Sequence, residues 1–503
     1  MRPIAFASWL LPLALACRPA TQDAAAARTP SPGDGRIPIT TRSADARALF
    51  LRGRALNENL QPLEARALFE QVVAIDPAFA FGEYSLATVS PTAKEIDKHL
   101  AQALALASTA STGERWLIQG FQARRQGDPA RARQLADSLV VRYPQDERAH
   151  WTLGNACAAA QQYDCAIAEF RAAIRLDPAY SLAYNQLGYA YRGAGRLAEA
   201  ESAFKRYIAL VPNDPNPYDS YAELLMKWGR FDESIVQYRK ALAIDGHFTG
   251  SFVGIAADEM YAGRYPAAIA EAERYLAMAR DDRERRLALL TLAMIHVDRG
   301  ATDEALAVLE RRHALVRAIG DTVEMAADGV QMADVLLAAG RVTAAQARYT
   351  RAHGLLASAR VTAATKQDDA LAARYDAARV ALAMGDLATA RVEALAYATE
   401  ATARHNDVRV RQAHELNGSI AIAARRFDEA LSELAQADQQ DPAVWAARAR
   451  AYAGFGDMAK ASASAAEARN MNILPTFAYV FTRAALAAST RSATSRSAGG
   501  TPR

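Results

Sequence analysis

The feature that most constrains the fold is a spacing of small, aromatic and proline residues that recurs every 34 residues. It is clearest in AYNQLGYAYRGAGRLAEAESAFKRYIALVP, where the marked residues are Leu187, Gly188, Ala200, Phe204 and Pro212. One period earlier, the same frame contains Leu153, Gly154, Ala166, Phe170 and Pro178. A unit that repeats at this period cannot bury its apolar face alone, so neighbouring units must stack around a continuous core. The chain is therefore expected to be a repeat array.

Each unit is expected to be a pair of antiparallel helices. A turn led by glycine recurs at one register in eight segments: GDPARA, GRLAEA, GRFDES, GRYPAA, GATDEA, GRVTAA, GDLATA and GDMAKA. Small residues at the eighth and twentieth positions of the frame, such as Gly188 and Ala200, lie where two such helices cross most closely. Phe204 is expected to fill the gap toward the next hairpin, and Pro212 ends the second helix. The pattern thus predicts a series of helical hairpins.

This pattern resembles the tetratricopeptide repeat, whose signature is an aromatic-x-x-Leu-Gly-x-x-Tyr segment, then Ala-x-x-x-Phe, then Pro. The resemblance implies an all-α fold, an α-solenoid of about twelve tetratricopeptide-type helical hairpins that form a right-handed superhelix. Even spacing of the eighth residue predicts a regular block over residues 46–282, and wider spacing after the charged run RDDRERR predicts longer, irregular hairpins over 283–474. A closing helix is expected over 475–489, because a terminal repeat must cover its outer face, and a disordered tail over 490–503.

The first residues predict export. In MRPIAFASWLLPLALAC, Arg2 precedes an apolar run that is too short to span a bilayer and has the length of a signal-peptide core. Residues 1–16 are therefore expected to be a signal peptide, and residues 17–45 a flexible tether rich in Pro, Gly, Thr and Ala.

The run LALAC resembles a bacterial lipobox, which implies acylation of Cys17. Ala14 departs from that pattern, because a lipobox prefers a large aliphatic residue three positions before the cysteine. The resemblance implies a protein of the periplasm or cell envelope, attached to a bacterial membrane by an N-terminal lipid anchor only. The alternative is cleavage after Ala16 without acylation, which gives a soluble periplasmic or secreted protein.

The composition argues against a nucleic-acid-binding protein. The chain has 51% hydrophobic and 8% aromatic residues, and its formal net charge is +3 over 503 residues. Small apolar residues with few aromatics suit closely packed helices. A nucleic-acid-binding protein should carry a concentrated basic stripe, and the repeats contain none. No nucleic-acid partner is therefore expected.

The sequence contains no recognisable catalytic motif. A phosphate-binding glycine loop, HExxH, a nucleophile elbow and an EF-hand loop are all missing, and the eight histidines never pair at metal-ligand spacing. No catalytic residue, metal or cofactor is expected.

Cys157 and Cys165 occupy the eleventh and nineteenth positions of one hairpin. Their register favours two free, buried thiols, whereas an oxidising compartment would allow a disulfide.

The surface that remains for function is the inner face of the superhelix. In the family that this sequence resembles, the second, fifth, sixth, ninth, twelfth and thirteenth positions of each first helix line that face and carry no packing. In the best-formed repeats these positions hold amides, aromatics and charged residues, namely Trp151, Asn155, Asn185, Gln186, Tyr189, Arg192, Asp219, Glu223 and Lys227. Amides bond a peptide backbone and aromatics accept its side chains. These nine residues are the candidate peptide-binding set; the alternative is that they are solvated helix surface.

One ligand of such repeats does not fit this chain. Co-chaperone repeats of the family clamp a C-terminal carboxylate with Lys and Asn in one repeat, Asn in the next, and Lys and Arg in the third. Asn155 matches one of the Asn positions, but Trp151 stands at the Lys position and Gln186 replaces the second Asn. Asn216 and Ser220 replace the basic pair. Recognition of chaperone tails is therefore not expected.

These features leave three functions to compare. The first is an exported, lipid-anchored, non-catalytic scaffold that binds other proteins or peptides in the cell envelope. The alternative is a sensor or regulatory module with a separate signalling partner, because an array that starts with RALFLRGRALNE resembles the repeat halves of some bacterial regulators. An enzyme is disfavoured, since no stretch of the size of a catalytic domain remains once the hairpins are placed.

Overall fold

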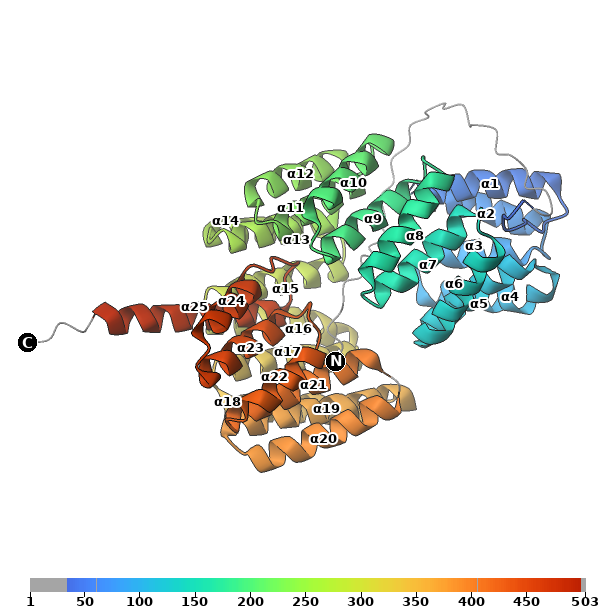
Figure 1. The fold of residues 1–503 in the computed structure, drawn as a ribbon. Helices are drawn as coiled ribbons and strands as arrows, with labels where there is room; N and C mark the ends of the chain where they lie inside the picture. Colours follow the sequence, from blue (N-terminus) through green and yellow to red (C-terminus); the bar gives the residue numbers. More distant parts are fainter. Residues whose placement is uncertain (1–33, 60, 405, 499–503) are drawn as a thin grey trace, which may run out of the picture. The chain divides into compact units, whose positions relative to one another are not determined.

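The computed structural model describes residues 34–59, 61–404 and 406–498, and these form helices with no β-strand among them (Figure 1). The expected all-α solenoid is confirmed, since the described residues contain 25 α-helices and one short 3-10 helix, η1 (Ala107–Thr109). The predicted signal peptide and Cys17 lie outside the described residues.

Consecutive helices pair as antiparallel hairpins, and the described residues contain twelve of them, the number that the repeat spacing predicts. The first six hairpins consist of α1 (Ala44–Glu58), α2 (Pro62–Ile75), α3 (Ala80–Val89), α4 (Ala93–Ala105), α5 (Thr112–Gln126), α6 (Pro129–Arg142), α7 (Glu147–Ala159), α8 (Tyr163–Leu176), α9 (Ser181–Gly193), α10 (Leu197–Leu210), α11 (Asn216–Lys227) and α12 (Phe231–Ile244). The last six consist of α13 (Thr249–Tyr261), α14 (Tyr265–Met278), α15 (Asp282–Asp298), α16 (Thr302–Ile319), α17 (Thr322–Ala338), α18 (Val342–Ser358), α19 (Ala363–Met384), α20 (Leu387–Ala403), α21 (Asp407–Ala423), α22 (Phe427–Gln436), α23 (Pro442–Phe455) and α24 (Met458–Arg469). A final helix, α25 (Phe477–Ala498), follows them.

The chain divides into two compact units. The N-terminal unit includes the described residues up to 224 together with 236–248, and the C-terminal unit includes residues 225–235 and the described residues from 249 onward. The boundary passes through α11 and α12, so each of these helices contributes to both units.

The small eighth residue of the repeat lets an aromatic ring reach the crossing point of its own hairpin. A Cβ atom on Gly188 would lie 2.6 Å from Cζ of Phe204, and a Cβ atom on Gly154 would lie 2.5 Å from Cε1 of Phe170. Both rings are fully buried. Phe204 therefore packs against the first helix of its own hairpin, and not only toward the next hairpin as the sequence pattern suggested.

Glycine in the hairpin turns has a conformational role instead. Gly195, between α9 and α10, has a φ of 74°, and no atom lies within 4 Å of a Cβ placed on it. Glycine adopts this left-handed conformation without the steric cost that a side chain brings. In the α7–α8 turn Gln161 takes the same conformation, with a φ of 59°, where a non-glycine residue costs about 1 kcal/mol.

Helix length changes in the second half of the array. Helices α1–α14 have 10–15 residues, whereas α15–α21 have 17–22 residues. The last hairpins are short again, since α22 has 10 residues and α24 has 12. The long hairpins that the sequence predicts over residues 283–474 therefore end with α21.

The structure corrects the prediction that residues 17–45 form a flexible tether. Within the described part, Ile37 is fully buried and Ile39 is only 5% exposed. The backbone N–H of Ile37 donates to Oδ2 of Asp146 over 2.8 Å, and Ser43 caps the first helix, which begins at Ala44. The burial of these two isoleucines explains why this segment packs against the repeats in spite of its linker-like composition.

The two repeat cysteines are joined, which corrects the expectation of free thiols. Cys157 lies in the last turn of α7 and Cys165 in the first turn of α8, and their sulfurs form a disulfide with the Cα atoms 5.8 Å apart. The tight turn at Gln161 brings these two helix turns within disulfide range, closer than the repeat register suggested.

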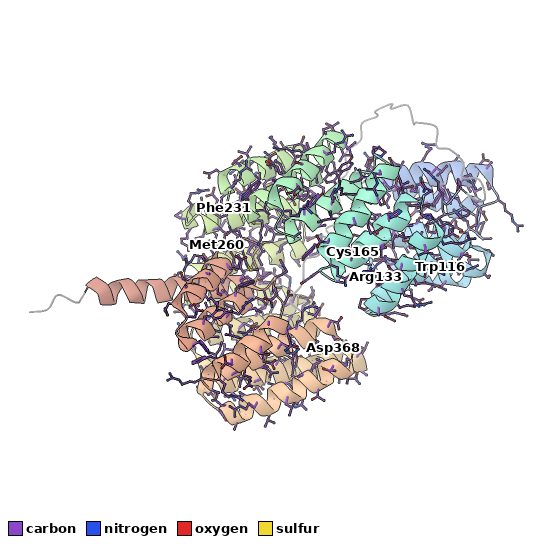
Figure 2. All side chains as sticks on the ribbon, viewed as in Figure 1. Trp116, Arg133, Cys165, Phe231, Met260 and Asp368 are labelled. Carbon is purple, nitrogen blue, oxygen red and sulfur yellow. A yellow bond between two sulfur atoms is a disulfide. The ribbon has the colours of Figure 1, made fainter. Side chains whose placement is uncertain are left out.

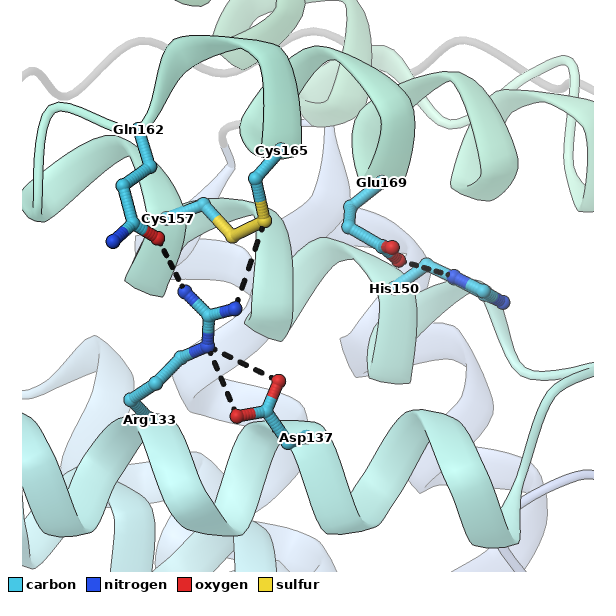
Figure 3. The surroundings of a disulfide bond; sticks show 7 residues. All are labelled: Arg133, Asp137, His150, Cys157, Gln162, Cys165 and Glu169. Atoms are coloured by element: carbon cyan, nitrogen blue, oxygen red, sulfur yellow. Dashed lines mark hydrogen bonds and ion pairs between the residues drawn. A yellow bond between two sulfur atoms is a disulfide. The ribbon is translucent and has the colours of Figure 1, made fainter.

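Arg133 of α6 lies beside Cys165 (Figure 2). Its guanidinium donates to Cys165 Sγ over 3.7 Å, to Gln162 and to Asp137 (Figure 3).

The closing helix is present and longer than predicted. Helix α25 extends to Ala498, past residue 489 and into the segment expected to be a disordered tail. It packs on α23 and α24 and also on α15, so it covers more than the outer face of the last hairpin. The ring of Tyr479 lies 5.5 Å from the ring of Tyr261 at the end of α13, and Tyr261 Oη donates to the carbonyl of Ile473. The two ends of the C-terminal unit are thereby joined.

None of the helices in the described part of the chain combines the length and apolar character needed to cross a membrane.

Candidate peptide-binding surface

The nine candidate residues lie on three successive first helices of the array. Trp151 and Asn155 are on α7, a second group of four is on α9, and Asp219, Glu223 and Lys227 are on α11. Eight of the nine belong to the N-terminal unit, whereas Lys227 falls in the part of α11 that belongs to the C-terminal unit. The following geometry concerns the eight.

The structure brings three of these residues together around one tyrosine ring. The guanidinium carbon of Arg192 lies 4.6 Å from the centroid of the Tyr189 ring, and Nη1 of Arg192 donates to Oε2 of Glu223 over 2.9 Å. Tyr189 Oη donates to Oγ of Ser220 over 3.1 Å, and its ring meets Phe204 edge-on with centroids 5.2 Å apart. We call Tyr189, Arg192, Ser220 and Glu223 the tyrosine–arginine cluster.

The electrostatics of this cluster keep its arginine charged and its tyrosine neutral. Burial and the nearby Glu223 carboxylate raise the pKa of Tyr189. Burial opposes the charge on Arg192, but the carboxylate of Glu223 outweighs it, and the pKa of Arg192 is raised. Because Glu223 already neutralises Arg192, an anionic ligand would have to displace a buried carboxylate. The cluster is therefore better suited to a neutral peptide than to a free carboxylate.

Two of the candidate residues each have a polar side-chain atom that is buried without a hydrogen-bond partner. These atoms are the indole nitrogen Nε1 of Trp151 and the amide oxygen Oδ1 of Asn185, at the fifth positions of α7 and α9. The Trp151 ring packs on Tyr180, with centroids 6.4 Å apart, and Asn185 is 8% exposed. A buried donor or acceptor without a partner costs about 1–3 kcal/mol. One donor and one acceptor on neighbouring helices match the C=O and N–H groups of an extended peptide.

The remaining candidates differ in their surroundings. The Nδ2 group of Asn155 donates to the carbonyl of Trp151, one turn earlier in its own helix, over 2.8 Å. Gln186 and Lys227 are partly exposed. Asp219 is buried, and its charge helps to raise the pKa of Tyr189.

Sequence reasoning missed two polar groups on this face. Ser220 departs from the carboxylate clamp, yet it accepts the Tyr189 hydroxyl; its place at the sixth position of the repeat is the available signal. Glu58, at the end of α1, is the second group. Its burial raises its pKa to about 7, and its backbone carbonyl accepts from Ser181 Oγ of α9, 123 residues later. No local pattern could predict that contact.

The described residues contain no group of three or more His, Cys, Asp and Glu side chains that could hold a metal ion. The chemistry that the site offers is hydrogen bonding and aromatic packing.

Comparison with known proteins identifies the repeats. Residues 122–181, 159–215, 216–248 and 254–313 match the tetratricopeptide repeat. Over 95 residues the chain is 38% identical to the protein O-mannosyl-transferase Tmtc1 of Drosophila melanogaster, a match that covers 18% of this chain and 11% of that protein. The matched part of the chain thus spans about a tenth of the length of this relative.

Two solved structures are similar to parts of this chain. TTC0263, a tetratricopeptide repeat protein of Thermus thermophilus, is 21% identical, with 42% of this chain and 98% of that chain covered and a TM-score of 0.28. A tetratricopeptide repeat protein from Parabacteroides merdae is 13% identical, with 54% and 93% covered and a TM-score of 0.35. Repeats of this kind generally act as protein–protein interaction scaffolds and are typically non-catalytic. The chain carries tetratricopeptide repeats in residues 122–248 and 254–313, within a helical solenoid of tetratricopeptide-type hairpins.

Proposed function

We propose that this protein is a non-catalytic scaffold that binds an extended peptide segment of a partner protein on the inner face of α7, α9 and α11. The observation that carries this proposal is the pair of buried, unpartnered atoms, Trp151 Nε1 and Asn185 Oδ1. A peptide that hydrogen-bonds to both removes their desolvation cost, so binding is favoured by more than contact area alone.

The tyrosine–arginine cluster would form the next part of the binding surface. Stacking on Tyr189 and the ion pair with Glu223 hold the Arg192 guanidinium in place before any ligand arrives. A pre-positioned side chain loses little conformational entropy on binding. The N–H groups of Arg192 that Glu223 does not use are then available to peptide carbonyls.

The first experiment is selection of binding peptides from a random displayed library against the purified chain. The best peptide is then measured on Trp151→Phe, which removes the indole N–H but keeps a ring, and on Asn185→Leu. Each change is expected to weaken binding about tenfold, since each removes one hydrogen bond to a buried group.

Trp116→Phe on α5 is the matched control, because Trp116 lies outside the candidate set. It should leave the affinity unchanged. Equal affinity for wild type, Trp151→Phe and Asn185→Leu would place the binding site elsewhere, and failure to select any peptide would contradict peptide binding altogether.

The proposed setting is the bacterial cell envelope, with the chain attached through a lipid on Cys17 after removal of residues 1–16. This part of the proposal rests on the sequence alone: the short apolar run and the LALAC motif. Mass spectrometry of the mature N-terminus and membrane fractionation of wild type and Cys17→Ser test it. An acylated Cys17 and a membrane pool that is lost in the variant are expected. Cleavage without lipid contradicts the anchor, and an uncleaved Met1 in the cytosol contradicts export.

A further inference from the structure

Residues 35–41 form no helix or strand, and other parts of the N-terminal unit hydrogen-bond to their backbone and side chains. We call this segment the strap. The carbonyl of Gly35 accepts from the backbone N–H of Gln145 over 3.0 Å. The N–H of Ile37 donates to Asp146, and the carbonyl of Ile37 accepts from Nη2 of Arg148 over 3.1 Å. One residue of the strap is therefore bonded on both sides of its peptide backbone by α7 and its cap.

The other end of the strap is held in the same manner. The N–H and the hydroxyl of Thr40 donate to the two carboxylate oxygens of Glu114, over 3.1 and 2.7 Å. The hydroxyl of Thr41 donates to Oδ2 of Asp76, at the end of α2, over 2.6 Å. Glu114 is fully buried, and burial raises the pKa of its carboxyl group. Without Thr40, this buried carboxylate would keep only its contacts with Ser111.

The strap also fills an apolar site. A Cβ atom on Gly113, at the start of α5, would lie 2.8 Å from Cγ2 of Ile37 and 2.8 Å from the ring of Tyr143. The glycine thus leaves room for the Ile37 side chain, which is completely buried between these residues. The N–H of Gly113 donates to Tyr143 Oη, which fixes the wall of the site.

These contacts are those of a bound peptide: backbone groups read by side chains, an aliphatic side chain in a fitted site, and a hydroxyl in a buried hydrogen bond. We propose that the surface formed by Asp76, Gly113, Glu114, Tyr143, Asp146 and Arg148 is a second peptide-binding site. The strap occupies it in cis, and an extended partner peptide of the same chemistry competes for it. That chemistry is a pair of β-branched aliphatic residues flanking a proline, followed by threonine, as in the Ile-Pro-Ile-Thr of residues 37–40.

This proposal does not depend on the surface of Trp151 and Asn185, because its residues lie at the ends of α2 and α6 and at the starts of α5 and α7, and none belongs to the nine candidates. Arg148 has an additional feature in its favour. It is 9% exposed and its Nη1 has no partner, so the receptor retains a donor that the strap leaves unused. A partner peptide with one more carbonyl at that point would gain a hydrogen bond over the strap.

The test uses the full chain and a fluorescein-labelled synthetic peptide with the sequence of residues 34–43. Ile37→Asp in the protein should displace the strap, because it places a charge in the apolar site. Fluorescence anisotropy should then show binding of the peptide at least about tenfold tighter than to wild type, where a tethered competitor fills the site. The same peptide carrying Ile37→Asp should not bind, and Glu114→Gln combined with Ile37→Asp in the protein should weaken binding about tenfold.

Two results would overturn the proposal. One is an Ile37→Asp protein with wild-type circular dichroism that does not bind the peptide; the other is equal binding to wild type and variant. If the variant does not fold, hydrogen exchange on the wild-type protein decides. The amides of Ile37 and Thr40 should exchange by local opening, faster than the amides inside α5 and α7. Exchange of all of these only on global unfolding would make the strap a permanent part of the core and exclude its displacement.

Discussion

Arg483 of α25 forms an ion pair with Asp298 of α15 across 185 positions of the sequence, with Nε 2.8 Å from Oδ1. The carboxylate is almost completely buried, and its second oxygen accepts from Tyr265 Oη over 3.0 Å. The guanidinium lies 4.6 Å from the centroid of the Tyr261 ring. This single side chain therefore connects the last helix of the C-terminal unit to its first two hairpins.

Replacing Arg483 by Met should destabilise the C-terminal unit by about 3 kcal/mol, because Asp298 is then left as a buried charge without its counter-ion. Urea unfolding followed by circular dichroism measures the loss. Arg285→Met is the control, since Arg285 pairs with Asp282 on an exposed surface and should leave the midpoint unchanged. Equal midpoints for the Arg483 variant and wild type would show that α25 does not hold the unit together.

A pair of glycine substitutions tests the packing rule of the repeat. Gly188→Ala should cost about 1–3 kcal/mol, because the new methyl group collides with the buried ring of Phe204. Gly120→Ala changes the same repeat position in α5, but the nearest atom there is Nη1 of Arg124 at 4.0 Å. This second change should stabilise the protein by about 0.5–1 kcal/mol, through helix propensity.

Thermal and urea unfolding of the two glycine variants, measured side by side, checks this difference in sign. Loss of stability in both would mean that the small residue is needed for backbone approach in every hairpin, independently of the phenylalanine.

The Cys157–Cys165 disulfide should contribute about 2–3 kcal/mol, the value expected for a short closed loop. Alkylation of the unfolded, unreduced protein followed by mass spectrometry should find both cysteines unmodified, and reduction should make both reactive. The Cys157→Ser, Cys165→Ser double variant should lose the same stability as the reduced protein. Full alkylation before reduction would contradict the bond.

Stability of the C-terminal unit should depend on pH through His353. Burial opposes its charge, but hydrogen bonds to Asp369 and Asp376 outweigh burial and raise the pKa of His353 from 6.5 to about 9. A group whose pKa is raised on folding stabilises the fold below its unfolded pKa and loses this effect as pH rises through the folded value. The contribution should thus be complete below pH about 6.5 and lost by pH about 9.

The measurement is the free energy of unfolding of wild type and His353→Gln across that range. The difference between the two should shrink by about 2 kcal/mol from pH 6.5 to pH 9. His247→Gln, at an exposed histidine of the N-terminal unit, serves as the control. A difference that stays constant with pH would show that folding does not raise the pKa of His353.

The hairpins could be predicted from the sequence because their signals are local. Gly188 and Phe204 are 16 positions apart, and the same steric fit recurs between Gly154 and Phe170. The contacts that close each unit involve distant residues, such as Ser181 with Glu58 and Arg483 with Asp298, and no repeat pattern encodes them. The strap has the composition of a linker, because proline, glycine and threonine dominate its surroundings; its two isoleucines are the only signal that it packs.

Repeat positions place the candidate residues on three first helices, but they do not determine how these residues contact one another. Repeat positions identified Trp151, Asn185, Tyr189 and Arg192, yet they could not show that Arg192 would be neutralised by Glu223 or that Asn155 would bond its own helix. Those outcomes depend on side-chain conformations across neighbouring helices, which the spacing of residues does not determine.

Helix α25 contacts the first helices of the C-terminal unit, α13 and α15, as well as the last, α23 and α24. A repeat array with two free ends can gain or lose a hairpin by gene duplication or deletion with little effect on the rest. In this unit an added or missing hairpin would carry α24 away from α15, and α25 could no longer reach both. The contacts of α25 therefore restrict the number of hairpins in this unit. Among related proteins, differences in length should be confined to the loops between its helices.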